Sequence, residues 1–169
     1  YDARRGVTSG ARPHRWVLDS RSAIVGFRAW LAARRGRLVP FWLPSNQADM
    51  LVVANVGSGS TTITVENRGY TALFDTTADL ATIGRRDIMI LSTAGVRYYR
   101  RITASVVLTA TTERITIDSS LGVALNTTQI ALVSFMRLVR LASDAVELAH
   151  HTDELAEVVL SLASVRDDV

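Results

Sequence analysis

Short runs of β-branched residues, separated by turn-forming residues, fill the middle of the chain and constrain its fold more than any other feature. Two hairpins are predicted from these runs, one from strands at 87–91 and 96–102 and one from strands at 105–109 and 114–117. Short strands joined by tight turns are typical of small barrels and sandwiches. We therefore expect residues 85–121 to form a small inserted β-domain.

The segments on either side of this block carry further strand patterns. Residues 129–141 are rich in β-branched and large apolar side chains and predict a long, largely buried strand. Residues 61–66 alternate threonine with aliphatic residues, as a half-buried strand does. Together the segments 12–84 and 122–169 predict the main domain, an antiparallel β-sandwich or barrel, in a mainly β (α+β) protein.

One amphipathic helix is predicted inside this main domain, over residues 21–35. Ser20 or Ser22 can cap its start, and Gly36 can supply the left-handed residue that ends it. Arg34 and Arg35 lie in the last turn, where positive charge complements the helix dipole. The apolar residues that fall close to one helical face are Ile24, Phe27, Trp30 and Leu31.

The segment 153–165 fits two patterns. A helix capped near Thr152 would place Leu155, Val158, Val159 and Leu162 on one face. A strand would place Val158, Leu160 and Leu162 on one face instead. Periodicity does not decide between them, but the density of β-branched residues favours a strand.

The two ends of the chain and its apolar content limit the class of protein. Residues 1–11 are polar and aperiodic and predict an N-terminal arm, and the missing Met leaves open a true start further upstream. The acidic pair Asp167-Asp168 is expected to be solvated. No apolar run approaches the roughly 20 residues of a membrane-spanning helix. We expect a soluble protein with no membrane partner.

The residues that carry chemistry form no recognisable pattern. Cysteine is absent, which excludes thiol catalysis, disulfides and cysteine-bound metals. The histidines His14, His150 and His151 lack the spacing of a metal-binding motif. The turn Gly57-Ser58-Gly59-Ser60 matches neither a nucleophile elbow nor a phosphate-binding loop. We expect no catalytic site, no metal and no cofactor, and hence no enzyme.

The positive charge of the chain comes entirely from arginine. The net charge is +3, and all 19 basic residues are arginines spread along the sequence rather than clustered. Specific nucleic-acid binding would need a clustered basic face and is not expected. Arginine is instead enriched at protein interfaces, where its planar fork pairs with carboxylates.

The segment Phe41-Trp42-Leu43-Pro44 allows two interpretations. Trp42 could pack under Phe27 or Trp30 in the core, which is the favoured interpretation, or it could anchor a subunit interface. The candidate interface residues of the whole chain are Trp30, Arg34, Arg35, Phe41, Trp42, Arg85, Arg86, Arg100 and Arg101.

A family likeness lies in the junction between the predicted helix and the aromatic segment. The sequence 27–37, followed by Pro40 to Pro44 and by Asp49, resembles a pattern in tail proteins of long-tailed bacteriophages and gene transfer agents. Residues 144–148 and 156–165 resemble the end of such proteins, in which a final strand returns to pair with the opening strand near Trp16.

This resemblance implies a structural protein of the virion, similar to distal tail and tail-tip proteins of the baseplate. Such proteins form homo-oligomeric rings that join the tail tube to the hub and fibres and are assembled in the host bacterial cytoplasm. A hexamer is expected first and a trimer second. The alternative is a carbohydrate- or receptor-binding β-sandwich module on the virion, which would use exposed aromatic residues; the candidates for this role are Trp42, Tyr70, Tyr98 and Tyr99.

Overall fold

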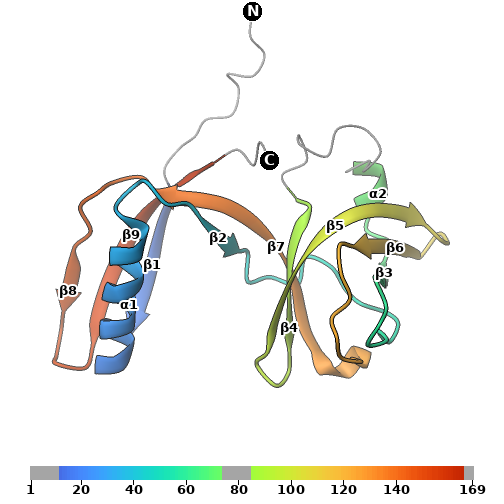
Figure 1. Cartoon of the computed structure of the whole chain (residues 1–169), viewed down its shortest axis with the longest axis horizontal. Coiled ribbons are helices and arrows are strands. Elements are labelled where there is room, and N and C mark those ends of the chain that lie inside the picture. The colour runs from blue at the N-terminus through green and yellow to red at the C-terminus, as the bar shows by residue number, and fades with distance from the viewer. Residues whose placement is uncertain (1–11, 74–84, 166–169) are drawn as a thin grey trace, which may run out of the picture. The chain divides into compact units, whose positions relative to one another are not determined.

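The computed structural model of the protein describes residues 12–73 and 85–165. The expected arm at 1–11 and the pair Asp167-Asp168 lie outside the described residues. Nine strands and two helices occupy the described part, and the paired strands whose register is defined run antiparallel (Figure 1). The prediction of a mainly β, antiparallel protein is confirmed, although the strand path runs from β1 to β3 and does not close into a barrel.

The helices and strands run in this order: β1 Arg12–Leu18, α1 Arg21–Arg34, β2 Phe41–Pro44, β3 Thr62–Glu66, α2 Tyr70–Leu73, β4 Asp87–Ser92, β5 Arg97–Val107, β6 Thr112–Ile117, β7 Ile130–Leu141, β8 Leu148–His150 and β9 Ala156–Ser164.

The chain divides into two compact units. Among the described residues, unit 1 contains 12–42 and 138–165, and unit 2 contains 43–73 and 85–137. Strands β2 and β7 each pass from one unit to the other. These boundaries fall at positions different from those of the expected main domain and its 85–121 insertion.

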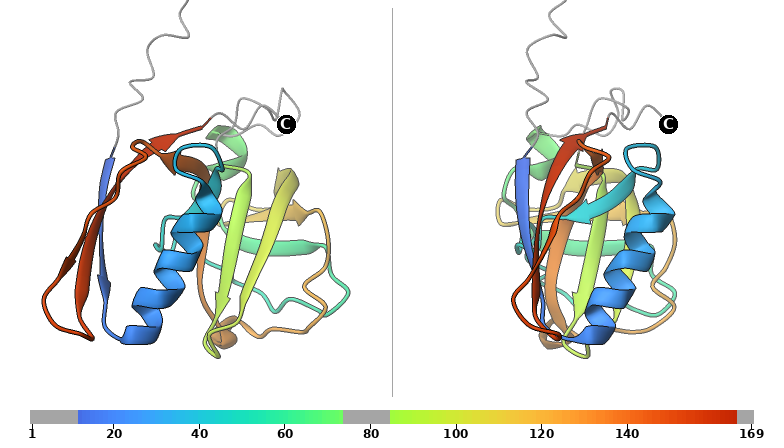
Figure 2. Two further views of the ribbon diagram at one scale, coloured as in Figure 1. Left: turned by 60° about the vertical axis from the view of Figure 1, so that its left-hand side comes forward. Right: turned by 90° about the vertical axis from the view of Figure 1, so that its left-hand side faces the viewer.

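Unit 1 is a small sheet with one helix on one of its faces. β9 pairs antiparallel with β1 along its length, and on its other side it pairs with β8 and with the end of β7. Figure 2 shows β8 and β9 running side by side. The expected pairing of the last strand with the first occurs, with Trp16 opposite Val158. The segment 153–165 is therefore mainly a strand, as its β-branched density predicted.

The helix α1 follows from local chemistry. The Ser20 hydroxyl accepts a hydrogen bond from the Ala23 amide at 3.2 Å and caps the first turn. Ile24 and Phe27 are buried on the face turned toward the sheet. The helix ends at Arg34 because the next residue, Arg35, already adopts a left-handed conformation, with φ of 50°.

Unit 2 is built on the path β7-β4-β5-β6-β3, and both predicted hairpins are present in it. The two strands expected at 96–102 and 105–109 are, however, mainly one strand, β5, of 11 residues. Its first half pairs with β4 and its second half with β6, with a register shift between Ile102 and Ala104. This bulge lets a single strand serve two hairpins.

The core of unit 2 is made by aliphatic residues that alternate with more exposed ones along β3 and β6, whereas Ile88, Met89 and Ile90 of β4 are buried in succession. Ile88 and Ile90 of β4 lie beside Ile102 of β5 and Ile115 of β6, all almost fully buried. Such side chains fill a half-buried sheet well, which is why the period-two pattern located the strands.

Candidate functional site

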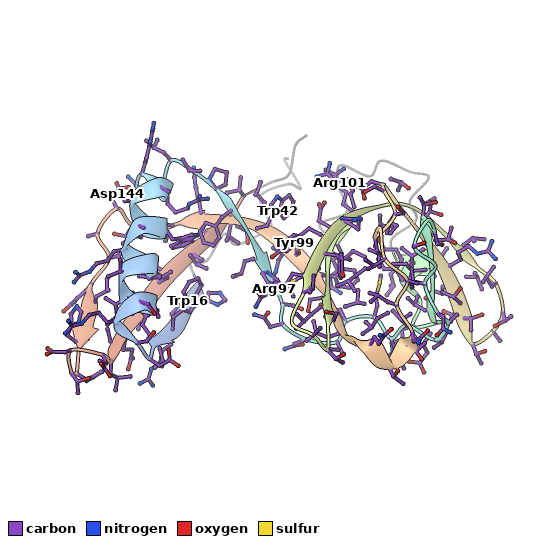
Figure 3. The ribbon with its side chains drawn as sticks, turned by 60° about the horizontal axis from the view of Figure 1, so that its bottom comes forward. Trp16, Trp42, Arg97, Tyr99, Arg101 and Asp144 are labelled. Carbon is purple, nitrogen blue, oxygen red and sulfur yellow. The ribbon has the colours of Figure 1, made fainter. Side chains whose placement is uncertain are left out.

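An aromatic cluster in unit 1 contains two of the predicted interface residues. The Trp30 ring lies 5.7 Å from that of Trp16, 5.5 Å from that of Phe27 and 4.9 Å from that of Phe41. The Phe41 ring meets it edge-on at 81°. These separations are typical of stabilising aromatic pairs. Trp30 and Phe41 therefore pack within the subunit, together with Trp16 (labelled in Figure 3).

The neighbouring residue Trp42 does not take the place that the favoured interpretation gave it. Phe41, not Trp42, packs on Trp30, because successive residues of a strand point to opposite faces. The Trp42 side chain is 37% exposed. Of the three aromatic residues expected at an interface, Trp42 is exposed, whereas Trp30 and Phe41 are partly buried.

The arginines at the end of α1 have unequal roles. The Arg34 guanidinium lies 5.7 Å from the Trp30 ring, and its Nη1 donates to the carbonyl of Pro40 at 3.4 Å. This cation–π contact holds Arg34 against its own unit. Arg35 is exposed and remains a candidate for contact with another molecule.

The turn after α1 is closed by Asp144. Its Oδ1 accepts from the Arg37 amide at 2.8 Å and its Oδ2 lies 3.2 Å from Arg37 Nε. Asp144 is labelled in Figure 3. Gly36 lies directly beneath the carboxylate, with φ of 64°. Three residues that carry the family resemblance thus fasten the turn of the fold.

Asp49, another residue of that resemblance, fastens a loop to β7 in unit 2. Its Oδ2 accepts from the Phe135 amide at 2.8 Å and from the Ser45 hydroxyl, and its own amide donates to the carbonyl of Val133 at 2.9 Å. The Asp49 carboxylate is therefore used within the fold. The carboxylates of Asp144 and Asp49 therefore each hold a neighbouring part of the chain by hydrogen bonds inside one unit.

Arg85 and Arg86 differ in exposure. The Arg85 guanidinium lies 5.6 Å from the Phe135 ring, and the residue is exposed. Arg86 is buried, with its Nε 3.7 Å from the Asp87 carboxylate. A buried arginine beside a carboxylate contributes to the subunit rather than to a surface, so Arg85 is the better interface candidate of the two.

Arg100 and Arg101 likewise make contacts within unit 2. Arg100 donates to the carbonyls of Ser119 at 2.9 Å and Ser120 at 2.6 Å, and so holds the loop after β6. Arg101 Nε donates to Asp87 Oδ1 at 2.9 Å across the β4–β5 pair. The partners of both arginines were not evident from the sequence.

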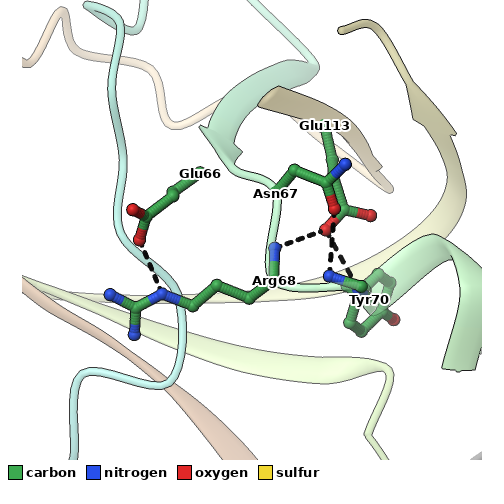
Figure 4. A network of polar contacts seen from close by, with 6 residues as sticks. Glu66, Asn67, Arg68, Tyr70 and Glu113 are labelled. Carbon is green, nitrogen blue, oxygen red and sulfur yellow. Dashed lines mark hydrogen bonds and ion pairs between the residues drawn. The ribbon is translucent and has the colours of Figure 1, made fainter. Parts of the chain in front are cut away.

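A buried carboxylate organises one end of unit 2, and sequence analysis did not single it out. Glu113 is fully buried and accepts from the amides of Arg68 at 3.1 Å, Tyr70 at 2.9 Å and Thr71 at 2.6 Å (Figure 4). Burial raises the pKa of Glu113, but the hydrogen bonds from Thr71, Tyr70 and Arg68 outweigh burial, so its pKa lies below the usual range. The only sequence signal was a charged residue at an inward position of β6.

A cavity of about 100 Å³ lies beside this carboxylate. Its walls include Asp49, Glu113 and Phe135, whose contacts have been described above. Ligand pockets for small molecules are typically about 300–1,000 Å³. The cavity is too small to hold a substrate of that size.

The face of the unit 1 sheet that lies away from α1 is open and partly apolar. Val17 is 61% exposed and Val159 is 53% exposed. Between them Arg15 Nη2 lies 2.5 Å from Glu157 Oε2 on the neighbouring strand. This pair lowers the pKa of the Glu157 carboxyl and raises that of Arg15. We call the residues Arg15, Val17, Glu157 and Val159 the open sheet face.

A second exposed apolar surface lies at the far end of the β5–β6 hairpin in unit 2. Val106, Val107 and Leu108 are all exposed there. The second half of β5 pairs with β6, while β4 pairs with its first half. Successive residues of a strand point to opposite faces, so Val106 and Val107 each expose an apolar side chain on a different face of the hairpin.

The three tyrosines expected of a carbohydrate-binding platform, all in unit 2, differ in exposure. Tyr70 is only 5% exposed, and its ring stacks on that of Phe135 at 5.8 Å. Tyr98 is half-buried against the core, and Tyr99, on the opposite side of the strand, is 54% exposed. Tyr70 cannot offer its face to a sugar, so the platform loses one of its four expected members.

No protein-family model matches the chain, and no curated protein matches its sequence. Within residues 12–73 and 85–165, no helix is long and apolar enough to cross a membrane. In the same part of the chain, no three His, Asp or Glu side chains lie close enough together to hold a metal ion.

Proposed function

We propose that the protein is a structural, non-enzymatic subunit of a bacteriophage tail tip or baseplate. In this proposal it forms a closed homo-oligomeric ring, a hexamer first and a trimer second, that joins the tail tube to the hub and fibres. It is assembled in the host bacterial cytoplasm and works within the virion.

The observation that carries the proposal is the open sheet face of unit 1. A sheet that is covered on one side only exposes its other side to water, and such faces normally carry polar residues. Here Val17 and Val159 are more than half exposed, on neighbouring strands. Burying apolar side chains on association contributes roughly 25 cal/mol for each Å² removed from water. This face therefore suits contact with a neighbouring subunit.

Two further features support the proposal. The apolar end of the β5–β6 hairpin offers unit 2 a contact surface of its own, and a ring needs two different surfaces on each subunit because its contacts are heterologous. The residues that resemble tail proteins, among them Gly36, Asp49 and Asp144, hold the connecting turns of the fold.

The experiment measures the mass of the full chain by light scattering during sizing chromatography at micromolar concentration. A closed oligomer is expected, with ring-shaped particles in negative-stain electron microscopy. The variant Val159→Glu places a carboxylate on the open sheet face at a position that is 53% exposed, so the fold can accept it. It is expected to reduce the assembly to monomers.

The matched control is Val96→Glu, which adds the same charge at an exposed position in the turn between β4 and β5. The control is expected to assemble as the parent does. A parent chain that stays monomeric at these concentrations would overturn the ring proposal. An assembly that Val159→Glu leaves intact would remove the open sheet face from it.

A further inference from the structure

A groove of about 610 Å³ runs between α1 and the end of β8 in unit 1. One wall carries Arg21, Val25 and Arg28 of the helix, and the other carries His150 and Asp153. This volume falls in the range of small-molecule sites, but the groove is open to solvent, because the side chains of both walls are exposed.

The helix wall of the groove is cationic. Arg21 and Arg28 are seven residues apart, which is two helical turns, so they share one face of α1. The first turn of α1 contains no acidic residue that would offset the positive end of the helix dipole. The groove thus combines two guanidinium groups with a helix whose first turn holds no acidic side chain, although Asp19 precedes the Ser20 cap and Asp153 lines the opposite wall.

Arg28 has hydrogen-bonding capacity to spare. Its Nη2 lies 3.1 Å from Nε2 of His150, and because arginine can only donate, the imidazole nitrogen accepts this bond. In the described part of the chain this is the only polar contact of Arg28, although a guanidinium has five N–H donors. The contact orients the guanidinium and leaves most of its fork for another acceptor.

The carboxylates nearby leave this charge largely uncompensated. Asp153 lies 3.7 Å from Arg21, beyond hydrogen-bonding distance, and both side chains are strongly exposed. Glu157 is engaged by Arg15 and belongs to the open sheet face. Neither carboxylate contacts Arg28.

We infer that this groove binds a phosphomonoester, with the phosphate held by Arg28 and Arg21 and the body of the ligand lying along Val25. A planar guanidinium pairs bidentately with phosphate oxygens, and a ready-oriented fork loses little freedom on binding. Val25, an exposed valine in the wall of the groove, provides apolar contact for an organic group beyond the phosphate. This inference does not depend on the proposed function.

The test is a titration of the full chain followed by amide NMR shifts, at a fixed ionic strength of about 0.1 M. The probes are butyl phosphate, inorganic phosphate and acetate. Shifts confined to residues 21–28 and 150–153 are expected, with butyl phosphate binding more tightly than inorganic phosphate and acetate binding least. Equal responses to phosphate and acetate, or shifts spread over the chain, would mean general attraction of anions and would overturn the inference.

The variant Arg28→Gln keeps a donor for His150 but removes the charge and the fork. It is expected to weaken butyl phosphate binding about tenfold or more, as hydrogen bonds to charged groups contribute about 1.5–3 kcal/mol. The control Arg114→Gln removes an exposed arginine from β6 and should leave binding unchanged. Two results would contradict a specific phosphate site. One is equal weakening of binding by both variants. The other is no binding by the parent at about 20 mM butyl phosphate, the range expected of a single weak site.

Discussion

The carboxylate of Asp144 lies over Gly36 so closely that a Cβ atom added to the glycine would overlap Oδ1. That oxygen is also the acceptor for the Arg37 amide, at 2.8 Å. Gly36 has a φ of 64°, in the left-handed region that favours glycine. The glycine is therefore required at this position both by its backbone and by the side chain that closes over it.

Replacing Gly36 by alanine is expected to lower the free energy of unfolding by about 2 kcal/mol. A left-handed backbone costs about 1–2 kcal/mol for a residue with a Cβ atom. In addition, the Asp144 side chain must move away from Arg37 and lose its hydrogen bond. The matched control is Gly26→Ala, inside α1, where an added Cβ meets no atom within 4 Å. The control should raise stability by about 0.5–1 kcal/mol. Urea unfolding measures both, and equal signs would contradict the explanation.

The aromatic cluster gives a second prediction. Trp30→Ala removes a ring that contacts Trp16, Phe27 and Phe41. It should lower the free energy of unfolding by about 3 kcal/mol. This is the lower end for deletion of a large aromatic side chain, because Trp30 is only half-buried. Val25→Ala on the same helix, at an exposed position, should change stability by less than about 0.5 kcal/mol. Thermal unfolding of the two variants distinguishes the effects, and comparable losses would contradict a core role for Trp30.

Local signals were sufficient for much of the fold. The helix was located by a capping serine, a helical spacing of apolar residues and a left-handed stop, all of which act within a few residues. β9 was recognised from its β-branched density. The continuous strand β5 was split in the prediction because its bulge between Ile102 and Ala104 depends on pairing with two different strands. Such pairing is set by the whole sheet and leaves no local pattern.

The candidate site residues were harder to predict for the same reason. An arginine pair in a sequence does not reveal whether its partners lie inside the subunit or outside it. Arg100 bonds to Ser119 and Ser120, about one hairpin further along the chain, and Arg101 pairs with Asp87 across the β4–β5 pair. The sequence did not indicate whether Phe41 or Trp42 packs against the helix, because this depends on which face of the strand each side chain occupies.

Glu113 gives a third prediction, on acid stability. The pKa of Glu113 is lowered in the folded protein, so its contribution is present above the unfolded-state pKa of about 4.3 and is lost as the pH falls through the folded value. Glu113→Gln should cost about 2–3 kcal/mol at pH 7, since amides of Arg68, Tyr70 and Thr71 lose a charged acceptor. Its stability should then fall less steeply than that of the parent below about pH 4.

The control for this carboxylate is Glu66→Gln, which affects an exposed pair with Arg68. Exposed ion pairs contribute about 0–1 kcal/mol, so this variant should follow the parent closely at every pH. Urea midpoints measured from pH 3 to pH 7 (roughly the range over which carboxyls titrate) give the comparison. Parallel curves for the parent and Glu113→Gln would contradict the charged role of Glu113.

Tyr70 gives the last prediction, at alkaline pH. Burial, together with the charges of Asp87 and Glu113, raises the pKa of the Tyr70 phenol to about 12. The unfolded chain ionises near pH 10 and so binds fewer protons than the folded chain between about pH 10 and 12. Stability that is fully present below pH 10 should therefore fall by about 2–3 kcal/mol as the pH rises through this window.

The variant Tyr70→Phe should be less stable than the parent at pH 7 by about 1 kcal/mol, because the phenol donates to the carbonyl of Arg85 at 3.2 Å. Above about pH 10, where free tyrosine ionises, this variant should lose less stability than the parent. The curves of unfolding free energy against pH for the two proteins should therefore converge or cross. Tyr99→Phe, at an exposed position, should keep the slope of the parent. Urea unfolding of the parent and both variants between about pH 8 and 11.5 gives the comparison. If the stability of Tyr70→Phe falls with pH as steeply as that of the parent, this phenol does not cause the loss of stability at alkaline pH.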